Sequence, residues 1–454
     1  MEKEKGSEND SNTGSQIRTE IFEGSVDRTE DADVKSPQAT ATATPLAEPK
    51  TPDVPDGGLV AWLQVLGAFV IMLASWGLTN SFGVYQTYYE TDLLRSSTSS
   101  EISWIGSLQG ALLNMGGLVS GPLFDAGHFR ALIISGSALV VLGLFMTSLC
   151  KTYWQVLLAQ GVAVGAGCGL LFLPSAAILS QYFARRRALA LGLQSAGSPV
   201  GGIIISVLFS RLQPRIGFGW ATRVLAFILL GLLVVPLVYM RPRVAPPRKR
   251  AFFDRDAIRD VPFMSFAISA LPSFMGMFVP FFYLQLFALR RGIASADLAA
   301  YLITLLNAGS IFGRILPNFA ADYLGSMNML AAMTLGAGIL AFSWLGVHDL
   351  GGTITFAILF GFFNGGVASL PPSAIVTLTP DLGRLGTRMG MLFAFIGIAV
   401  LIGTPIAGAI LKDVNDDGAW RGLIAYCATT VFVGGLGFVS TQVLHLRRVG
   451  STKV

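Results

Sequence analysis

The chain is short of charge, of cysteine and of histidine. Only 13% of its 454 residues are Asp, Glu, Lys or Arg, while 52% are hydrophobic and the mean hydropathy is +0.61. A soluble domain carries about 25% charged residues. This composition therefore excludes a soluble domain and indicates a membrane protein that crosses the bilayer several times. The three cysteines match no metal-ligand spacing, and their odd number does not suggest a disulfide framework.

Acidic and basic residues are distributed unevenly along the chain. Residues 1–58 hold 6 basic and 13 acidic side chains, a net charge of −7, whereas the remainder carries a net charge of +12. The first 58 residues are also rich in Ser, Thr and Pro, which predicts a disordered tail. The basic excess lies in short stretches between apolar runs and not on one soluble face, so no nucleic-acid partner is expected.

Twelve apolar runs follow this tail. Each is about 20 residues or longer, enough to cross a ~30 Å hydrocarbon core, and lipid forces such segments to be helices. The sequence therefore predicts an all-α membrane protein with twelve transmembrane helices in two six-helix halves. The runs lie near 60–82, 102–124, 131–149, 153–180, 188–210, 220–240, 262–287, 298–321, 329–347, 353–378, 389–411 and 420–444.

The distribution of basic residues predicts the orientation of these helices. Loops on the same side as the two termini carry 16 Lys and Arg, against 9 on the other side, which favours cytoplasmic termini in a multi-pass protein of the cell membrane. The expected organisation is a cytoplasmic tail, a first half, a cytoplasmic linker, a second half and a short cytoplasmic tail. The corresponding residues are 1–58, 59–240, 241–261, 262–445 and 446–454.

The two halves repeat each other. Pro174-Ser175-Ala176 returns as Pro372-Ser373-Ala374 at an offset of 198, and Asp125 returns as Asp322 at an offset of 197. Two halves in parallel repeat are typical of carriers that hold a substrate at the interface between the halves and rock around it.

Residues 121–130, with the sequence GPLFDAGHFR, join the second and third runs. This segment resembles the loop signature of the major facilitator superfamily, in which a glycine, an aspartate and a basic residue brace one conformation of the transport cycle. The resemblance implies this role for Gly121, Asp125 and Arg130, with Asp322 as the counterpart in the second half. His128 stands where the family pattern has glycine.

Three further segments narrow the resemblance. Asp53 to Gly58 (DVPDGG) precedes the first run, Tyr182 to Gly192 (YFARRRALALG) joins the fourth and fifth, and Ala196 to Gly202 (AGSPVGG) follows. Together they are similar to the fungal branch of the monocarboxylate porter family over residues 57–446. That family implies carriage of small organic acids, often with a proton, although some fungal members export products of biosynthetic clusters.

Arg314 is the single charge between Leu298 and Ala321. A lone arginine in lipid costs at least about 2.5–3.5 kcal/mol, so it should face the bundle interior or a water path. The resemblance makes it the arginine that pairs with substrate. Ser310 and Asn80, however, replace an aspartate and a lysine of the family pattern, and no Asp, Glu or His lies deep in any predicted span. A larger, weakly acidic or neutral substrate is therefore favoured over lactate with a proton.

Other polar or aromatic side chains within the spans are candidates for lining a central site. Each has a structural alternative as a packing contact or a hydrogen bond between helices. The candidate substrate-binding residues are Arg314, Asn80, Asn307, Asn114, Phe363 and Asn364.

The sequence thus predicts a secondary active transporter of a small organic molecule, with efflux of a fungal secondary metabolite or organic acid favoured. Uptake of a monocarboxylate or vitamin-like compound, by proton symport or facilitated diffusion, is the alternative. A non-transporting membrane sensor fits less well because both tails are short. The expected partners are the lipid bilayer and a small substrate, for which Arg314 suggests an acidic group. No obligate protein partner, cofactor, metal or enzymatic activity is indicated.

Overall fold

A computed structural model describes residues 56–183, 186–243, 254–379 and 385–450. All regular elements in these ranges are helical, which confirms the prediction of an all-α membrane protein. The predicted disordered tail falls almost entirely on residues 1–55, and the middle of the predicted linker falls on 244–253. Both stretches lie outside the described residues.

The helices of the first half follow the predicted runs closely. Short polar loops separate them, and side-chain caps begin several: Thr98 and Glu101, for example, form a reciprocal capping box at the start of α3. The elements are α1 (Leu59–Asn80), α2 (Phe82–Tyr88), η1 (Tyr89–Leu93), α3 (Ser99–Met115), α4 (Gly117–Asp125), α5 (Phe129–Thr147), α6 (Tyr153–Val156), η2 (Leu157–Val164), α7 (Gly165–Leu179) and α8 (Arg187–Tyr239).

The second half begins after a short helix in the predicted linker. Acidic or hydroxyl side chains cap its helices as well, with Ser295, Asp349 and Asp416 accepting from first-turn amides. The elements are α9 (Arg255–Arg259), α10 (Val261–Met277), α11 (Val279–Arg290), α12 (Ala296–Leu324), α13 (Ser326–Ser343), η3 (Trp344–Gly346), α14 (Leu350–Ser369), α15 (Pro371–Thr377), α16 (Leu385–Ile410) and α17 (Asp417–Val449).

Ten helical segments of the described chain are long and apolar enough to cross a membrane. One of them, Leu189–Tyr239, contains Gly217 with φ +76° and ψ 164°, a backbone conformation that residues with a Cβ rarely adopt. The long element α8 therefore consists of two helices that meet at Gly217. The run α3–α4, interrupted at Gly116, is not among the ten. Dividing α8 and adding α3–α4 matches the twelve runs of the sequence.

The first span is longer than its apolar run. The run ends near residue 82, but after an interruption at Ser81 the helix continues through α2 and the π-helical turn η1 to Leu93. Gln86 and Glu90 lower the hydropathy of this extension, which is why the sequence placed the end of the span too early. The correction puts two acidic side chains, Glu90 and Asp92, at the end of a candidate span.

The helix breaks repeat between the halves. Ser81 separates α1 from α2, and Phe278 separates α10 from α11 at an offset of 197, the spacing of the sequence repeat. Pro280 at the start of α11 removes a backbone donor, which favours the interruption at Phe278.

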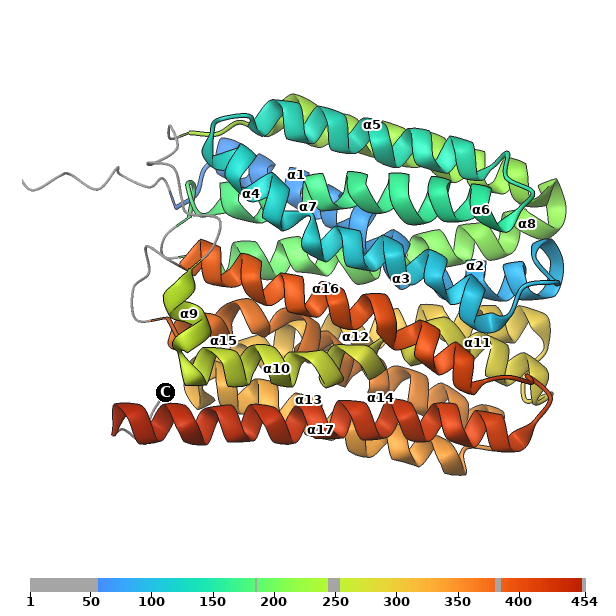
Figure 1. The fold of residues 1–454 in the computed structure, drawn as a ribbon. Helices are drawn as coiled ribbons and strands as arrows, with labels where there is room; N and C mark the ends of the chain where they lie inside the picture. The colour runs from blue at the N-terminus through green and yellow to red at the C-terminus, as the bar shows by residue number, and fades with distance from the viewer. Residues whose placement is uncertain (1–55, 184–185, 244–253, 380–384, 451–454) are drawn as a thin grey trace, which may run out of the picture. The chain divides into compact units, whose positions relative to one another are not determined.

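The halves meet mainly through three helix pairs: α8 with α12, α3 with α16, and α2 with α11. Figure 1 shows α1 beginning and α17 ending at one end of the helices, and α2 and α11 at the opposite end, here called the far end.

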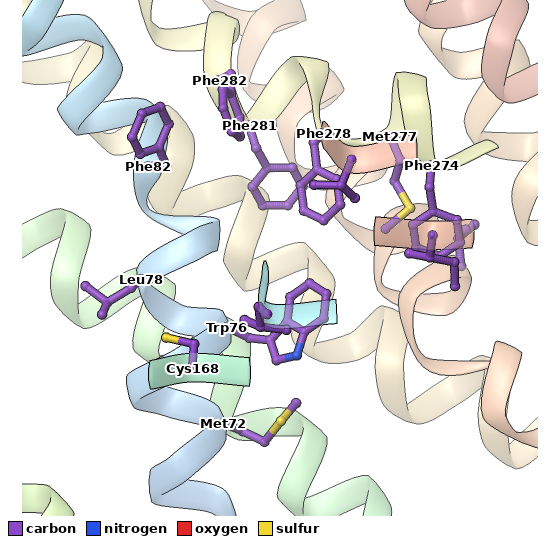
Figure 2. Packing of buried hydrophobic residues seen from close by; sticks show 14 of the residues in the cluster. Met72, Trp76, Leu78, Phe82, Cys168, Phe274, Met277, Phe278, Phe281 and Phe282 are labelled. Atoms are coloured by element: carbon purple, nitrogen blue, oxygen red, sulfur yellow. The ribbon is translucent and has the colours of Figure 1, made fainter. Parts of the chain in front are cut away.

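Close contacts at the far end join the two halves. Gly83 lies against the carbonyl oxygen of Phe281, and the rings of Phe82 and Phe282 are 4.8 Å apart (Figure 2). The Tyr283 hydroxyl is 3.3 Å from the carbonyl oxygens of both Ser99 and Thr404. We call this set the far-end seal: Phe82, Gly83, Ser99, Ser100 and Ser107 from the first half, with Phe281, Phe282, Tyr283, Thr404 and Pro405 from the second.

A buried ion-pair network holds the linker to the second half. Arg388 of α16 donates to Asp254 at 3.2 Å and to Asp260 at 2.8 Å, and all three side chains are 6% exposed. Arg448, in the last turns of α17, binds the other oxygen of Asp260 at 2.7 Å. Because breaking a buried ion pair leaves an uncompensated charge, the network ties α9, α16 and α17 together.

Replacing Gly83 by Ala should weaken the far-end seal, because the added methyl group would collide with the Phe281 backbone. We expect a loss of about 1–3 kcal/mol, as for other overpacked sites, measured as a lower melting temperature in detergent. Gly231→Ala is the matched control, since nothing lies within 4 Å of the position its methyl group would take. Equal effects of the two substitutions would contradict the packing described here.

Candidate functional site

A cluster of buried polar groups lies where α8 meets α12. The Ser198 hydroxyl oxygen accepts a hydrogen bond from Asn80 Nδ2 at 3.0 Å and one from Arg314 Nη2 at 3.4 Å. These residues come from α1, α8 and α12, so both halves contribute. Together with Asn307 they form what we call the central polar cluster: Asn80, Ser198, Asn307 and Arg314.

Arg314 is buried, with only 5% of the residue exposed. Its Nε has no hydrogen-bond partner, and no carboxylate of the described residues forms an ion pair with it. A single neutral hydroxyl is a weak counterpart for a guanidinium with five donors. The cluster therefore holds a positive charge with spare hydrogen-bonding capacity.

Asn307 stands two turns before Arg314 on the face of α12 that meets α8. Its Nδ2 donates to the Ile303 carbonyl at 2.9 Å, while its buried Oδ1 has no partner in the described chain. A methyl group at Gly202 of α8 would collide with this amide, so a glycine is what lets the two helices approach here.

Ser310 lies one helical turn before Arg314 on α12. It is fully buried, and its hydroxyl has no partner among the described residues. A methyl group at Gly365 of α14 would approach this hydroxyl to 3.0 Å. The position can neither carry a negative charge nor exchange a proton near neutral pH, so Arg314 lacks the neighbouring acid.

An aromatic group lies beside the cluster. Trp76, one turn before Asn80 on α1, stacks on Phe278 at 6.4 Å with an interplanar angle of 18° (Figure 2), and meets Phe172 edge-on at 5.8 Å. Phe172 in turn meets Phe393 of α16 at 5.6 Å. The indole Nε1 is buried without a hydrogen-bond partner, and a buried indole N–H usually has one.

Sequence reasoning did not select Trp76 or Ser198 as site residues. Both carried a signal: Trp76 is the one tryptophan far from a span end and precedes Asn80 by one helical turn, and Ser198 lies in the segment AGSPVGG. What could not be read was which helix each faces, because that depends on how the halves pack.

The other predicted residues lie elsewhere. Asn364 donates to the Met277 carbonyl at 3.2 Å and so supports the break between α10 and α11. Phe363 packs against Gly336 of α13, within the second half. Asn114 donates to Gly110 of its own helix at 2.8 Å, and its Oδ1 has no partner in the described part of the chain. The structure links Asn80 and Arg314 through Ser198, places Asn307 two turns from Arg314 on α12, and leaves these three residues outside the cluster.

Three of the predicted gating residues lie around the loop between α4 and α5, and the fourth, Asp322, lies at the end of α12. Gly121 is in α4, where an added methyl group would approach Leu173 to 3.0 Å, and Arg130 is exposed at the start of α5. Asp125 ends α4 and Asp322 lies in the last turn of α12, but their side chains lie outside the described part of the structure. Their role stays a prediction.

Two repeated helical halves with a polar, charged cluster at their interface define a membrane carrier. A solved structure shares this fold: the nucleoside transporter NupG matches with a TM-score of 0.66, at 13% identity, over 84% of this chain and 99% of that one. Residues 58–354 match the model of the Major Facilitator Superfamily. The chain belongs to the Major Facilitator Superfamily and is a membrane transporter.

Fungal transporters are similar to it over most of their length. An MFS-type transporter of Emericella nidulans, dbaD, is 45% identical and aligns over 84% of this chain and 85% of its own length. The aspyridones efflux protein apdF of the same organism is 37% identical over 86% and 80%. An MFS-type transporter of Aspergillus niger, pynF, is 38% identical over 89% and 95%.

The two buried arginines should respond oppositely to replacement by methionine. Arg388→Met removes the buried guanidinium that pairs with both Asp254 and Asp260, while Asp260 keeps its contact with the half-exposed Arg448, and this loss should cost about 3–5 kcal/mol and lower the melting temperature. Arg314→Met removes an unpaired charge from a buried site and should leave the melting temperature unchanged or higher. Melting curves in detergent test this pair, and a large loss in Arg314→Met would show that its charge is paired after all.

Proposed function

We propose that the chain exports a small organic molecule, a fungal secondary metabolite or an organic acid, by alternating access around the central polar cluster. The observation that carries this proposal is the buried, incompletely hydrogen-bonded charge of Arg314 at the interface between the halves. Support for the direction comes from a relative that is named an efflux protein. The proposal includes membership of the fungal branch of the monocarboxylate porters.

The electrostatics of the cluster favour a ligand with an acidic group. A guanidinium presents a rigid fork that matches a carboxylate or an enolate, and charge-assisted hydrogen bonds of this kind are stronger than neutral ones. The Nε–H of Arg314 and the Nε1–H of Trp76 are donors without acceptors in the described chain. An acidic ligand supplies the negative charge that Ser310 does not.

The aromatic group favours a ligand with a flat, apolar body. Trp76, Phe172, Phe278 and Phe393 come from both halves and contact one another, and Trp76 lies one helical turn from Asn80 of the cluster. Ring contacts contribute through burial and through preferred stacking geometry. A planar conjugated acid satisfies both features, whereas lactate would use only the charge.

The orientation and the gating residues complete the proposal. Both termini lie on the cytoplasmic side of the cell membrane, supported by the excess of basic residues in the loops on that side. Asp125 and Arg130, with Asp322 in the second half, brace one conformation of the cycle, as the loop signature GPLFDAGHFR implies.

Removing the charge of Arg314 should abolish transport of acids selectively. In inside-out vesicles supplied with a panel of conjugated fungal acids, each paired with its methyl ester, we expect Arg314→Ala to lower acid uptake about 10- to 100-fold. That range corresponds to the loss of a charged hydrogen bond of roughly 1.5–3 kcal/mol. Arg314→Lys should retain part of the activity because the charge remains.

Arg95→Ala is the control, because Arg95 is exposed on a far-end loop and pairs with Asp92. It should transport every acid at the wild-type rate. Equal loss of acid and ester transport in Arg314→Ala would indicate a structural role for the arginine, and normal acid flux in that variant would contradict the proposed site.

A further inference from the structure

A carboxylate stands beside the far-end seal. Glu90 lies in η1, a π-helical turn, and is only half-buried. Turns of this type are uncommon and often occur at functional sites. Asp254 and Asp260 are also buried, but both are held in ion pairs by Arg388. Glu90 forms no ion pair with any described residue and instead accepts a hydrogen bond from the amide of Gln86.

A chain of hydrogen bonds runs from this carboxylate into the second half. The buried Gln86 Nε2 also lies 3.4 Å from the Ser99 carbonyl oxygen, to which it donates. The same carbonyl accepts from the Tyr283 hydroxyl of α11 at 3.3 Å, and that hydroxyl shares its proton with the Thr404 carbonyl of α16. Opening the seal must break this chain, so Glu90 is linked to the contact that keeps the halves together.

Among the described residues, one cation acts on Glu90. From α11, Arg290 attracts the carboxylate, and Tyr283 is the other titratable side chain that acts on it. On its own turn, Asp92 is exposed and pairs with Arg95 at 3.4 Å. At the start of α3, Glu101 is exposed and accepts from the Thr98 amide.

The part of α16 that contacts the seal contributes no charged side chain. Helix α16 contributes the Thr404 hydroxyl and two backbone carbonyl groups to the seal. No titratable side chain of the described α16 takes part in these contacts. Two influences therefore oppose each other at Glu90. Hydrogen bonds from Gln86 and Ser99 and, more weakly, the attraction of Arg290 favour the carboxylate, whereas the loss of water when the seal closes disfavours it more strongly.

We propose that Glu90 is a proton-binding site that controls the far-end seal. The seal closes around the protonated carboxyl group and opens as the carboxylate forms and becomes hydrated. Removing water from a carboxylate costs more when it is ionised, and here no close cation compensates. In protonation, a proton from water at the far end forms the O–H bond of Glu90, and in opening that proton returns to water.

This site is separate from the central polar cluster and would respond to pH in the absence of any substrate. It requires only that the two halves move relative to each other at the far end. Failure of the substrate proposal for Arg314 would leave it standing, and the reverse also holds.

The test uses protons as the only ligand. Spin labels at Ser96→Cys and Asn415→Cys, two exposed far-end positions in different halves, report the seal in lipid nanodiscs after the three native cysteines are replaced by alanine. Distances are measured over about pH 4 to 8, which brackets the titration of partly buried carboxyls. The wild-type background should shift from short to long distances as the pH rises.

The variants separate Glu90 from its neighbours. Glu90→Gln, which resembles the protonated form, should stay at the short distance at every pH, and Glu90→Asp should still titrate. Glu101→Gln is the matched control, because it changes an exposed far-end carboxylate and can keep the helix cap, so it should behave as the wild type. A pH response that survives in Glu90→Gln, or no response in the wild-type background, would overturn the proposal.

Discussion

Arg314 carries its charge into the interface between the halves, where the described chain offers it one hydroxyl and no carboxylate. Lipid would not tolerate that charge, and a buried charge without a partner destabilises a protein interior. The surrounding packing follows from this constraint. Gly202 lets α8 approach Asn307, and a methyl group at Gly77 of α1 would come within 2.8 Å of Gly201, so small residues bring three helices around the guanidinium.

The cluster and the far-end seal are joined by the same interrupted helices. Trp76 and Asn80 occupy the last turns of α1 before the break at Ser81, and Phe282 follows the break at Phe278. Trp76 stacks on Phe278 itself, so one aromatic contact between the halves lies between the charge and the seal. In our account the breaks let the far-end segments move while the long helices stay intact, as alternating access requires.

Much of the fold could be predicted because lipid imposes length and hydropathy on every span. The prediction failed at the end of the first span, which is less apolar than the rest. Because α2 and η1 carry Gln86 and Glu90, hydropathy placed the end of this span too early. Arg314 and Asn80 could be selected because a polar group in a span is costly. Phe363 was placed in the site but packs on Gly336, since the sequence does not say which neighbour a ring faces. Trp76 and Ser198 were missed for the same reason.

The central claim is that the guanidinium of Arg314 binds the acidic group of the ligand. A direct binding measurement tests this claim most closely. Titration calorimetry of the purified transporter with a conjugated acid and with its methyl ester measures that charge without needing transport. Our account predicts that the wild type binds the acid at least about tenfold more tightly than the ester, a difference of about 1.4 kcal/mol, and that Arg314→Met binds both equally. Equal affinity of the wild type for acid and ester would contradict it.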